Sequence, residues 1–410
     1  MTKNKQNVPQ VRFKGFTDDW ELRKFSELYE KNMEKNSDLI GFDKTISIAT
    51  MTYKDEGNGA SDSSLSAYKV LRIGDIAFEG HTSKEFRYGR FVANDIGIGL
   101  MSPRFSTLRP IKEMPVDFWK HYIHYEPIMK YILVNATKAG TMMNELVIPE
   151  FLEQSLLVPS LKEQAKIGQY FTTLDHLITL HQRKCETLQK LKKSMLQKMF
   201  PKNGSHFPEI RFKGFTDAWE QRELGEIANR ITRKNQNLES TLPLTISAQY
   251  GLIDQNEFFD KRIASKDVSG YYLLKKGEFA YNKSYSSDAP WGAVKRLDRY
   301  ESGVLSTLYI IFELTDKTST DSDFIVSYYN TDRWHKEVQA IAAEGARNHG
   351  LLNISPNDFF ETELTIPKSV AEQQVIGQYF TNLDHLITLH QRKLETLKKL
   401  KKAMLQKMFI

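Results

Sequence analysis

EQAKIGQYFTTLDHLITLHQRKCETLQKLKKSMLQKMF, the stretch Glu163–Phe200, decides the organisation of this 410-residue chain because the chain contains it twice. The second copy, Glu372–Phe409, differs at six of its 38 positions. A shorter pair, VRFKGFTDDW at Val11–Trp20 and IRFKGFTDAW at Ile210–Trp219, opens the two halves in the same way. Between the matching ends lie roughly 130 residues per half in which the identity largely disappears. The sequence therefore predicts two tandem units in which a constant frame carries two different inserts.

The repeated stretch has the apolar spacing of a long helix, because its apolar residues recur mainly every three or four positions. Both copies begin with Ser-x-x-Glu, Ser160 to Glu163 and Ser369 to Glu372, in which each side chain can satisfy a free backbone N–H group. At 1.5 Å per residue each helix is expected to be about 55 Å long. The stripe comprises Ile167, Phe171, Leu174, Ile178, Cys185, Leu188, Met195 and Met199.

A helix of this length with a single apolar stripe is not stable alone in water, and its own copy offers a matching stripe. We therefore expect the two helices to pair. The spacing alone does not decide between parallel and antiparallel pairing. A pseudo-twofold relation between the two halves favours the antiparallel arrangement.

Composition limits the classes of protein to which the chain can belong. One cysteine, Cys185, excludes an internal disulfide and any site that needs several cysteines. The first ten residues have no apolar core of the signal-peptide type, and no apolar run approaches the 18 residues or so of a membrane span. We expect a cytoplasmic protein with no membrane partner. The net charge of +6 is modest, its excess lysines lie in the repeated helices, and it does not by itself indicate DNA binding.

The inserts are predicted to be divergent copies of one mixed α/β domain. Tyr68–Phe78 and Tyr271–Tyr281 align, and each contains an apolar run broken by Gly-Asp or Gly-Glu, which is typical of a hairpin turn. The loops that follow, Glu79–Arg90 and Asn282–Gly292, differ but are both rich in hydrogen-bond donors and aromatic residues.

The predicted fold class is α+β, with two mixed α/β domains joined by two long helices that pair as an antiparallel coiled coil in a pseudo-twofold tandem repeat. We expect the N-terminal repeat segment at 1–29, the first insert domain at 30–159, the central helix and linker at 160–205, the second copy of the N-terminal segment at 206–227, the second insert domain at 228–367 and the C-terminal helix at 368–410.

Motifs for catalysis are missing from the sequence. No two prolines are adjacent, which removes the Asn/Asp-Pro-Pro-Tyr signature of amino-methyltransferases, and neither a P-loop nor Gly-x-Ser-x-Gly occurs. His121 and His124 are spaced i, i+3, but no further ligand lies at a convincing spacing for a metal. The chain is therefore expected to bind rather than to catalyse, with no catalytic residue and no metal site.

Several short motifs, each given twice in the same order, carry a resemblance to a known family. Pro159-Ser-Leu-Lys-Glu-Gln164 leads into the first long helix, and Pro367 precedes Glu372-Gln373 with one extra residue between. The Gly-Asp strand and a glycine near Gly345 complete the order. In layout and in these motifs the chain resembles the specificity subunits of type I restriction–modification systems.

That resemblance implies a sequence-specific DNA-binding subunit that catalyses nothing itself. Each target-recognition domain would read one half of a bipartite target in double-stranded DNA, and the helices would set the spacer and dock the methyltransferase subunits. Partners would be two modification subunits and, optionally, two restriction subunits. S-adenosylmethionine, ATP and Mg²⁺ would be bound by those partners, and the complex would direct adenine-N6 methylation and restriction of unmethylated DNA.

Candidate DNA-binding residues are those in the divergent loops that can reach base edges or phosphates. For the tyrosines the alternative is packing, and for Arg87, Arg90 and Arg347 it is a surface ion pair. In the first domain the candidates are Thr50, Tyr53, Lys54, His81, Ser83, Lys84, Arg87 and Arg90. In the second domain they are Gln249, Tyr250, Lys283, Ser284, Tyr285, Ser287, Lys295, Arg347 and Asn348.

Two other classes of function remain open at this point. A structural scaffold could use the paired helices to hold protein partners without reading DNA, and it would be indifferent to DNA sequence. An enzyme with a cleft in each insert would need titratable groups repeated in both copies, and no such repeated pair is found.

Overall fold

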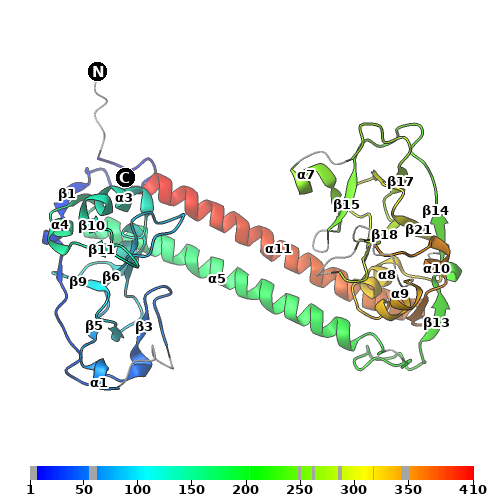
Figure 1. Ribbon diagram of the computed structural model, residues 1–410, viewed down its shortest axis with the longest axis horizontal. Helices are drawn as coiled ribbons and strands as arrows, with labels where there is room; N and C mark the ends of the chain where they lie inside the picture. The colour runs from blue at the N-terminus through cyan, green and yellow to red at the C-terminus, as the bar shows by residue number, and fades with distance from the viewer. Residues whose placement is uncertain are drawn as a thin grey trace. The chain divides into compact units, whose positions relative to one another are not determined.

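The computed structural model describes residues 7–54, 62–202, 204–247, 251–260, 264–284, 289–316, 318–342 and 351–410. The chain divides into two compact units (Figure 1). Unit 1 comprises Met1–Arg183 and Gln391–Ile410, and unit 2 comprises Lys184–His390. Each unit therefore contains part of both long helices.

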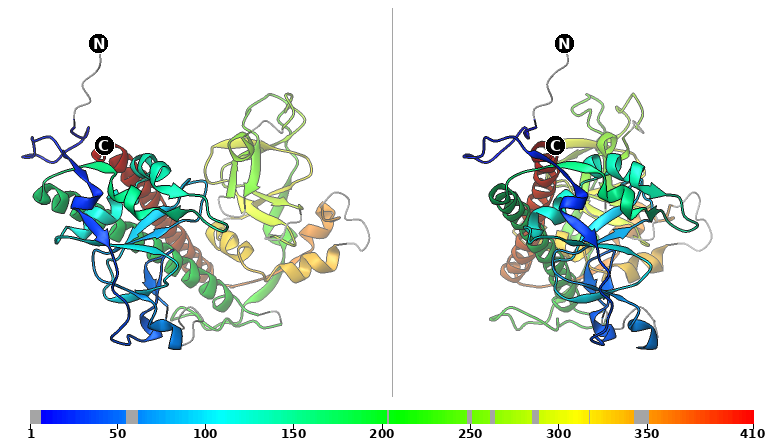
Figure 2. Two further views of the ribbon diagram at one scale, coloured as in Figure 1. Left: turned by 60° about the vertical axis from the view of Figure 1, so that its left-hand side comes forward. Right: turned by 90° about the vertical axis from the view of Figure 1, so that its left-hand side faces the viewer.

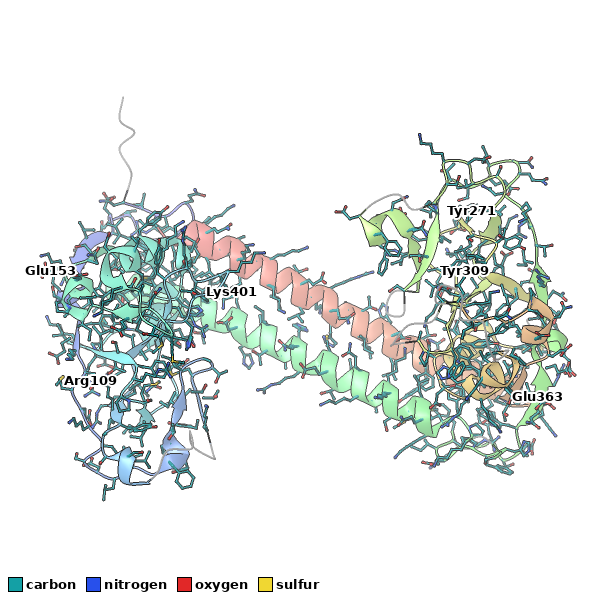
Figure 3. The ribbon with its side chains drawn as sticks, in the orientation of Figure 1. Arg109, Glu153, Tyr271, Tyr309, Glu363 and Lys401 are labelled. Carbon is teal, nitrogen blue, oxygen red and sulfur yellow. The ribbon has the colours of Figure 1, made fainter. Side chains whose placement is uncertain are left out.

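The two long helices are α5, Leu161–Lys198, and α11, Val370–Met408. In unit 1 the rings of Phe171 and Phe409 lie 5.4 Å apart, and Lys401, which is labelled in Figure 3, pairs with Asp175. Residue numbers thus rise along α5 as they fall along α11. The same holds in unit 2, where Phe200 lies 5.9 Å from Phe380 and Lys192 pairs with Asp384. The expected helix pairing and its antiparallel sense are confirmed within each unit.

Both units are built on a four-stranded antiparallel sheet with the same order of strands. In unit 1 the order is β2 (Tyr29–Lys31), β9 (Ser106–Pro110), β6 (Ile76–Glu79) and β7 (Arg90–Ala93). In unit 2 it is β14 (Ala228–Ile231), β21 (Ile310–Leu314), β18 (Phe279–Asn282) and β19 (Ala293–Arg296). The two inserts are therefore copies of one domain, and the predicted α+β class is confirmed.

Short elements surround each sheet. In unit 1 they are β1 (Glu21–Lys24), η1 (Phe25–Glu27), η2 (Phe42–Lys44), β3 (Ile46–Ser47), β4 (Thr52–Tyr53), α1 (Asp62–Leu65), β5 (Lys69–Leu71), β8 (Gly99–Met101), α2 (Val116–Tyr122), α3 (Glu126–Ala136), β10 (Thr137–Lys138), β11 (Glu145–Leu146), α4 (Ile148–Leu152) and β12 (Ser155–Val158). In unit 2 they are β13 (Glu220–Glu223), α6 (Leu224–Ile227), β15 (Leu244–Ser247), β16 (Gly251–Asp254), α7 (Gln255–Phe259), β17 (Tyr272–Lys275), β20 (Ser302–Leu305), α8 (Ser322–Tyr329), α9 (His335–Ile341), α10 (Pro356–Phe360) and β22 (Glu363–Ile366).

The Gly-Asp and Gly-Glu turns do not join hairpins, which corrects the expectation from the sequence. β5 pairs with β8, whereas β6 pairs with β7 and β9, so the turn connects two different sheets. The acidic residue of the turn has a structural task instead. Asp75 is 1% exposed and accepts from Arg109 at 2.7 Å, and Glu278 accepts from Arg233 at 2.7 Å in the other unit.

The repeated N-terminal segment is fastened to the start of each long helix by an ion pair between a partly buried arginine and a buried glutamate. Arg12 donates to both oxygens of Glu163, at 2.6 and 2.7 Å, and Arg211 does the same to Glu372, at 2.7 and 2.8 Å. The reciprocal capping box is therefore wrong as a prediction. The Ser160 hydroxyl does accept the Glu163 N–H group, at 3.4 Å, but the carboxylate is used by the arginine.

Each long helix also approaches a short helix of its unit very closely. A Cβ atom on Gly168 of α5 would lie 2.6 Å from the backbone nitrogen of Phe118 in α2, and one on Gly377 of α11 would lie 2.7 Å from that of Phe324 in α8. Only glycine permits this approach. The end of the other long helix completes each core, since Phe409 packs 5.9 Å from Phe118 in unit 1 and Phe200 packs 5.6 Å from Phe324 in unit 2. Figure 2 shows the C-terminal end of α11, in red, within unit 1.

Candidate nucleic-acid interface

The loop between β6 and β7, residues 80–89, carries four of the predicted site residues of unit 1, and a fifth, Arg90, directly follows it. A turn closes the loop, because the Ser83 N–H group donates to Phe86 O at 2.9 Å and Ser83 Oγ accepts from the Phe86 N–H group at 3.0 Å. Phe86 is buried, and its ring lies 4.8 Å from that of His124. The buried Phe86 side chain thus holds the exposed part of the loop in place.

Arg90 is held by several neighbours and connects two candidate segments. Its Nε donates to Glu79 at 2.6 Å, its Nη2 donates to Ala49 O at 3.2 Å, and its guanidinium lies 5.3 Å from the centre of the Phe86 ring. Arg90 therefore forms the ion pair that was the alternative to DNA binding. Its hydrogen bond to Ala49 also positions the next residue, the predicted site residue Thr50. His81 Nδ1 lies 3.8 Å from the same Glu79 carboxylate.

Arg87 and Lys84 are exposed, in contrast to Arg90. The backbone N–H group of Arg87 donates to Glu126 at 3.2 Å, and its guanidinium lies 5.7 Å from the centre of the Tyr88 ring. Burial raises the pKa of Glu126. Within the described residues Arg87 forms no side-chain ion pair, whereas Arg90 pairs with Glu79. Its guanidinium is therefore available to a base or a phosphate.

The segment around Tyr53 is more structural. The Tyr53 hydroxyl donates to Ile98 O at 2.9 Å, and Lys44 lies 4.8 Å from the ring centre. Thr50 and Thr52 share a hydrogen bond of 2.7 Å, and the Lys54 N–H group donates to Thr45 O at 2.8 Å. Tyr53 thus fits its packing alternative, while the side chains of Thr50 and Lys54 remain at the surface.

In unit 2 the structure describes three of the nine candidates. Lys283 Nζ donates to Ile354 O at 3.2 Å, and the Ser284 N–H group donates to Asn282 at 3.0 Å. Lys295 donates to Asn330 at 2.6 Å, and burial, with Lys192 nearby, lowers the pKa of Lys295 to about 8. The other candidates, Gln249, Tyr250, Tyr285, Ser287, Arg347 and Asn348, lie outside the described residues.

One part of this surface was missed from the sequence. The hairpin of β10 and β11 lies on the first residue of the 80–89 loop, because the Asn144 N–H group donates to Gly80 O at 2.9 Å. Exposed Arg104 lies beside it and contacts Met142. No motif marks these residues, because they are brought together only by tertiary packing.

The described residues hold no group of three or more His, Cys, Asp or Glu side chains that could bind a metal ion. His121 Nε2 lies 3.5 Å from Asp175, and His124 Nδ1 lies 3.1 Å from Phe91 O, so the two histidines face different partners. Among the helices of the described part of the chain, none is long and apolar enough to cross a membrane.

Comparison with known proteins gives one sequence relative and several structural ones. A protein of Methanocaldococcus jannaschii, provisionally named the type I restriction enzyme MjaX specificity subunit, is 24% identical over 250 residues. These residues span 54% of this chain and 55% of that protein, so the match covers about half the length of the relative. No protein-family model matches the chain.

The fold is that of a solved protein of the same description. The crystal structure of the type I restriction-modification system S subunit from M. genitalium aligns with a TM-score of 0.60 at 14% identity, covering 98% of this chain and 99% of that chain. The HsdS subunit from Thermoanaerobacter tengcongensis aligns with a TM-score of 0.45 at 16% identity, covering 95% of this chain and 96% of that chain. The resemblance to type I specificity subunits stated from the sequence is confirmed.

Proposed function

We propose that this chain is the DNA-recognition subunit of a type I restriction–modification complex. Its two target-recognition domains, placed at 30–159 and 228–367, would each read one half of a bipartite target in double-stranded DNA. Helices α5 and α11 would set the spacer and dock two methyltransferase subunits, with two restriction subunits as optional partners. The complex would direct adenine-N6 methylation and restriction of unmethylated DNA.

The observation that carries this proposal is a contrast between frame and loops. The two units share one order of strands and near-identical helices, yet the amino-acid sequences that follow β6 and β18 differ. A scaffold that only held protein partners would have no need for two different sets of exposed donors on one frame. Two different half-sequences would need them, because base edges are read by side chains matched to each base.

The test is to map N6-methyladenine in DNA from cells that express this chain with its methyltransferase partner. We expect one bipartite motif with two different halves. Arg87→Ala should alter one half and Lys283→Ala the other, at a cost of about 1 to 3 kcal/mol at one position if a base contact is lost. A lost phosphate contact would instead weaken all sequences alike and lower the salt dependence. Methylation without any sequence preference would favour the scaffold.

The chain alone is proposed to be non-catalytic. S-adenosylmethionine, ATP and Mg²⁺ would be bound by the partner subunits. Purified free of partners, the chain should neither transfer methyl groups nor cut DNA, and equilibrium dialysis should detect no binding of S-adenosylmethionine. Methyl transfer by the isolated chain would overturn this part of the proposal.

Two equivalent docking sites are proposed because the helices and the Phe-Lys-Gly-Phe segments are repeated almost unchanged. Native mass spectrometry at saturating methyltransferase subunit should show two copies bound per chain. Exposed leucines recur at matching helix positions, Leu180 with Leu389 and Leu191 with Leu400, and they are suitable sites for substitution. A complex that saturates at one copy would contradict the twofold arrangement.

A further inference from the structure

Unit 1 has a hollow of about 390 Å³ next to the 80–89 loop. Phe78 and Gly80 at the end of β6 line it, together with Arg104 and Ser106. Its remaining wall is the turn of the β10–β11 hairpin, residues 141–146. The hollow therefore adjoins the loop that carries the candidate residues of unit 1, although sequence analysis assigned no role to its walls.

Backbone contacts fix the hairpin in this place. Besides its hydrogen bond to Asn144, Gly80 makes an approach that only glycine allows, since a Cβ atom there would lie 1.8 Å from Asn144 O. Lys138 and Glu145 pair across the hairpin at 3.3 Å. The wall is thus a built feature of the domain.

Arg104 is the cationic residue of this hollow, and no carboxylate neutralises it within the described part of the chain. Arg72, Arg90 and Arg109 of the same insert are all paired with acidic side chains. The contact made by Arg104 is a weak one, from Nη2 to the Met142 sulfur at 3.7 Å. Its remaining donors are available, and a guanidinium with free donors in a fork matches the O6 and N7 acceptors of guanine.

Unit 2 places a corresponding segment at the corresponding position. Ser284, just after β18, forms a bridge with Leu351, and the Leu352 N–H group donates to Lys283 O at 2.9 Å. In both units the chain that precedes a short helix, α4 or α10, therefore lies on the end of the matching strand. This segment has the same place in both units but a different amino-acid sequence in each. Residues at such a position could distinguish two different half-targets.

We propose that Arg104, with Thr141 and Asn144 of the hairpin, forms a second base-reading element of unit 1, in which Arg104 reads a guanine. This inference rests on the proposed function and deepens it. Asn144 and Thr141 supply amide and hydroxyl groups for the neighbouring base or sugar. Met142, which is 75% exposed, supplies an apolar surface beside them.

The experiment uses the complex of the full chain with its methyltransferase partner and measures methylation across a library of targets. Arg104→Lys retains the charge but loses the bidentate geometry. We expect Arg104→Ala to reduce discrimination at one guanine of one half-target by about 5- to 150-fold, the range of a bidentate arginine–base pair, while the other half stays unchanged. Arg104→Lys should reduce it less, because a lysine can still donate to guanine but lacks the planar fork. Arg72→Lys is the matched control, since Arg72 is also exposed but paired with Glu34, and it should change neither half.

The outcomes separate this inference from the function on which it rests. A wild-type complex that shows no bipartite preference contradicts the proposed function. A wild-type complex that reads two halves, both unaltered by Arg104→Lys and Arg104→Ala, overturns only the role of Arg104. Uniformly weaker binding with a reduced salt slope assigns Arg104 to a phosphate and also overturns base reading. Thermal unfolding of each variant checks that the domain is folded.

Discussion

Lys192 Nζ donates to both carboxylate oxygens of Asp384, at 2.6 and 2.8 Å, and so joins α5 to α11 in unit 2. The same pair occurs in unit 1, where Lys401 is the repeat of Lys192 and Asp175 is the repeat of Asp384. Each helix thus supplies the aspartate of the ion pair in one unit and the lysine of the ion pair in the other unit. A single repeated sequence can supply both partners only if the helices run antiparallel.

Asp384→Asn should destabilise unit 2 modestly. The Asp384 side chain is 48% exposed, so we expect a loss of at most about 1 kcal/mol in the free energy of unfolding. Exchanging the charges, Lys192→Asp with Asp384→Lys, should restore most of it. Urea denaturation measures the effect, and Asp175→Asn is the matched variant in unit 1. A double variant less stable than either single variant would show that the pair is not the source of the effect.

Removing the buried carboxylate of the Arg12–Glu163 ion pair, which clamps the N-terminal segment to α5, should lower the free energy of unfolding by much more than Asp384→Asn does. Glu163 is 1% exposed and neutralises Arg12, so Glu163→Ala leaves a charge mostly buried, at a cost of about 3 to 5 kcal/mol. Glu372→Ala should cost about 1 kcal/mol more, because Glu372 also accepts from Trp219 Nε1 at 3.2 Å. In unit 1, within the described residues, Trp20 Nε1 has no hydrogen-bond partner. Equal losses in denaturant unfolding would contradict a role for the tryptophan bond.

Acid should destabilise unit 1 through His121. Burial lowers the pKa of His121 to about 3, and Lys401 and Lys120 act in the same direction, while Asp117 opposes them. The unfolded chain binds the proton below about pH 6.5 and the folded chain only near pH 3. Stability from this group is therefore complete above pH 6.5 and falls towards pH 3, by at most about 1.4 kcal/mol per pH unit.

His121→Ser provides the control, because the corresponding residue of unit 2 is Ser327. Phe118 and Phe324 occupy matching positions against Gly168 and Gly377. His121 and Ser327 each lie three residues after the matching phenylalanine and so correspond to each other. The variant should show a smaller loss of stability between pH 6.5 and 4 in denaturant titrations. An unchanged pH dependence would exclude His121 as its source.

If the helices measure the spacer, then lengthening both should lengthen the gap in the DNA target. Lys192 faces Asp384, so one heptad inserted after Leu188 and one after Ile387 would keep the seam in register. Seven residues add about 10 Å, which corresponds to about three base pairs. Mapping of N6-methyladenine should show both half-sequences retained at a gap up to about three base pairs longer. Methylation at the original spacing only, by a stable complex, would show that the helices do not set the gap.

The repeated helices and their pairing could be predicted because sequence identity and apolar period are local signals. The antiparallel sense could not be read from the apolar period and followed instead from the pseudo-twofold relation of the two halves. The glutamate in Ser160-x-x-Glu163 misled, since a capping box and a clamp to Arg12 use the same carboxylate, and only the fold brings Arg12 within reach. The Gly-Asp turn misled in a similar way. A tight turn is encoded locally, but the pairing of β5 with β8 is not.

The candidate site could be predicted only in part for the same reason. The sequence of the divergent loop predicted both Arg87 and Arg90 as site residues. It did not show that Arg90 pairs with Glu79 while Arg87 stays exposed. Arg104 and Asn144 lie far along the chain from Gly80 and have no motif. A backbone hydrogen bond to Gly80 places Asn144 beside the loop, and Arg104 lies there through its contact with Met142 of the same hairpin. The residue types reveal neither contact.

Phe409 has a consequence for the order in which the protein is made. Its ring packs against Tyr122 and Phe171 in the core of unit 1, so that core stays incomplete on the ribosome until residue 409 has emerged. Unit 2 consists of residues 184–390 and has all its parts earlier. Domains usually fold in the order of their synthesis, the N-terminal one first. Here unit 1 is begun first but completed after unit 2, and a nascent chain interrupted between residues 390 and 409 would carry one complete unit, the second.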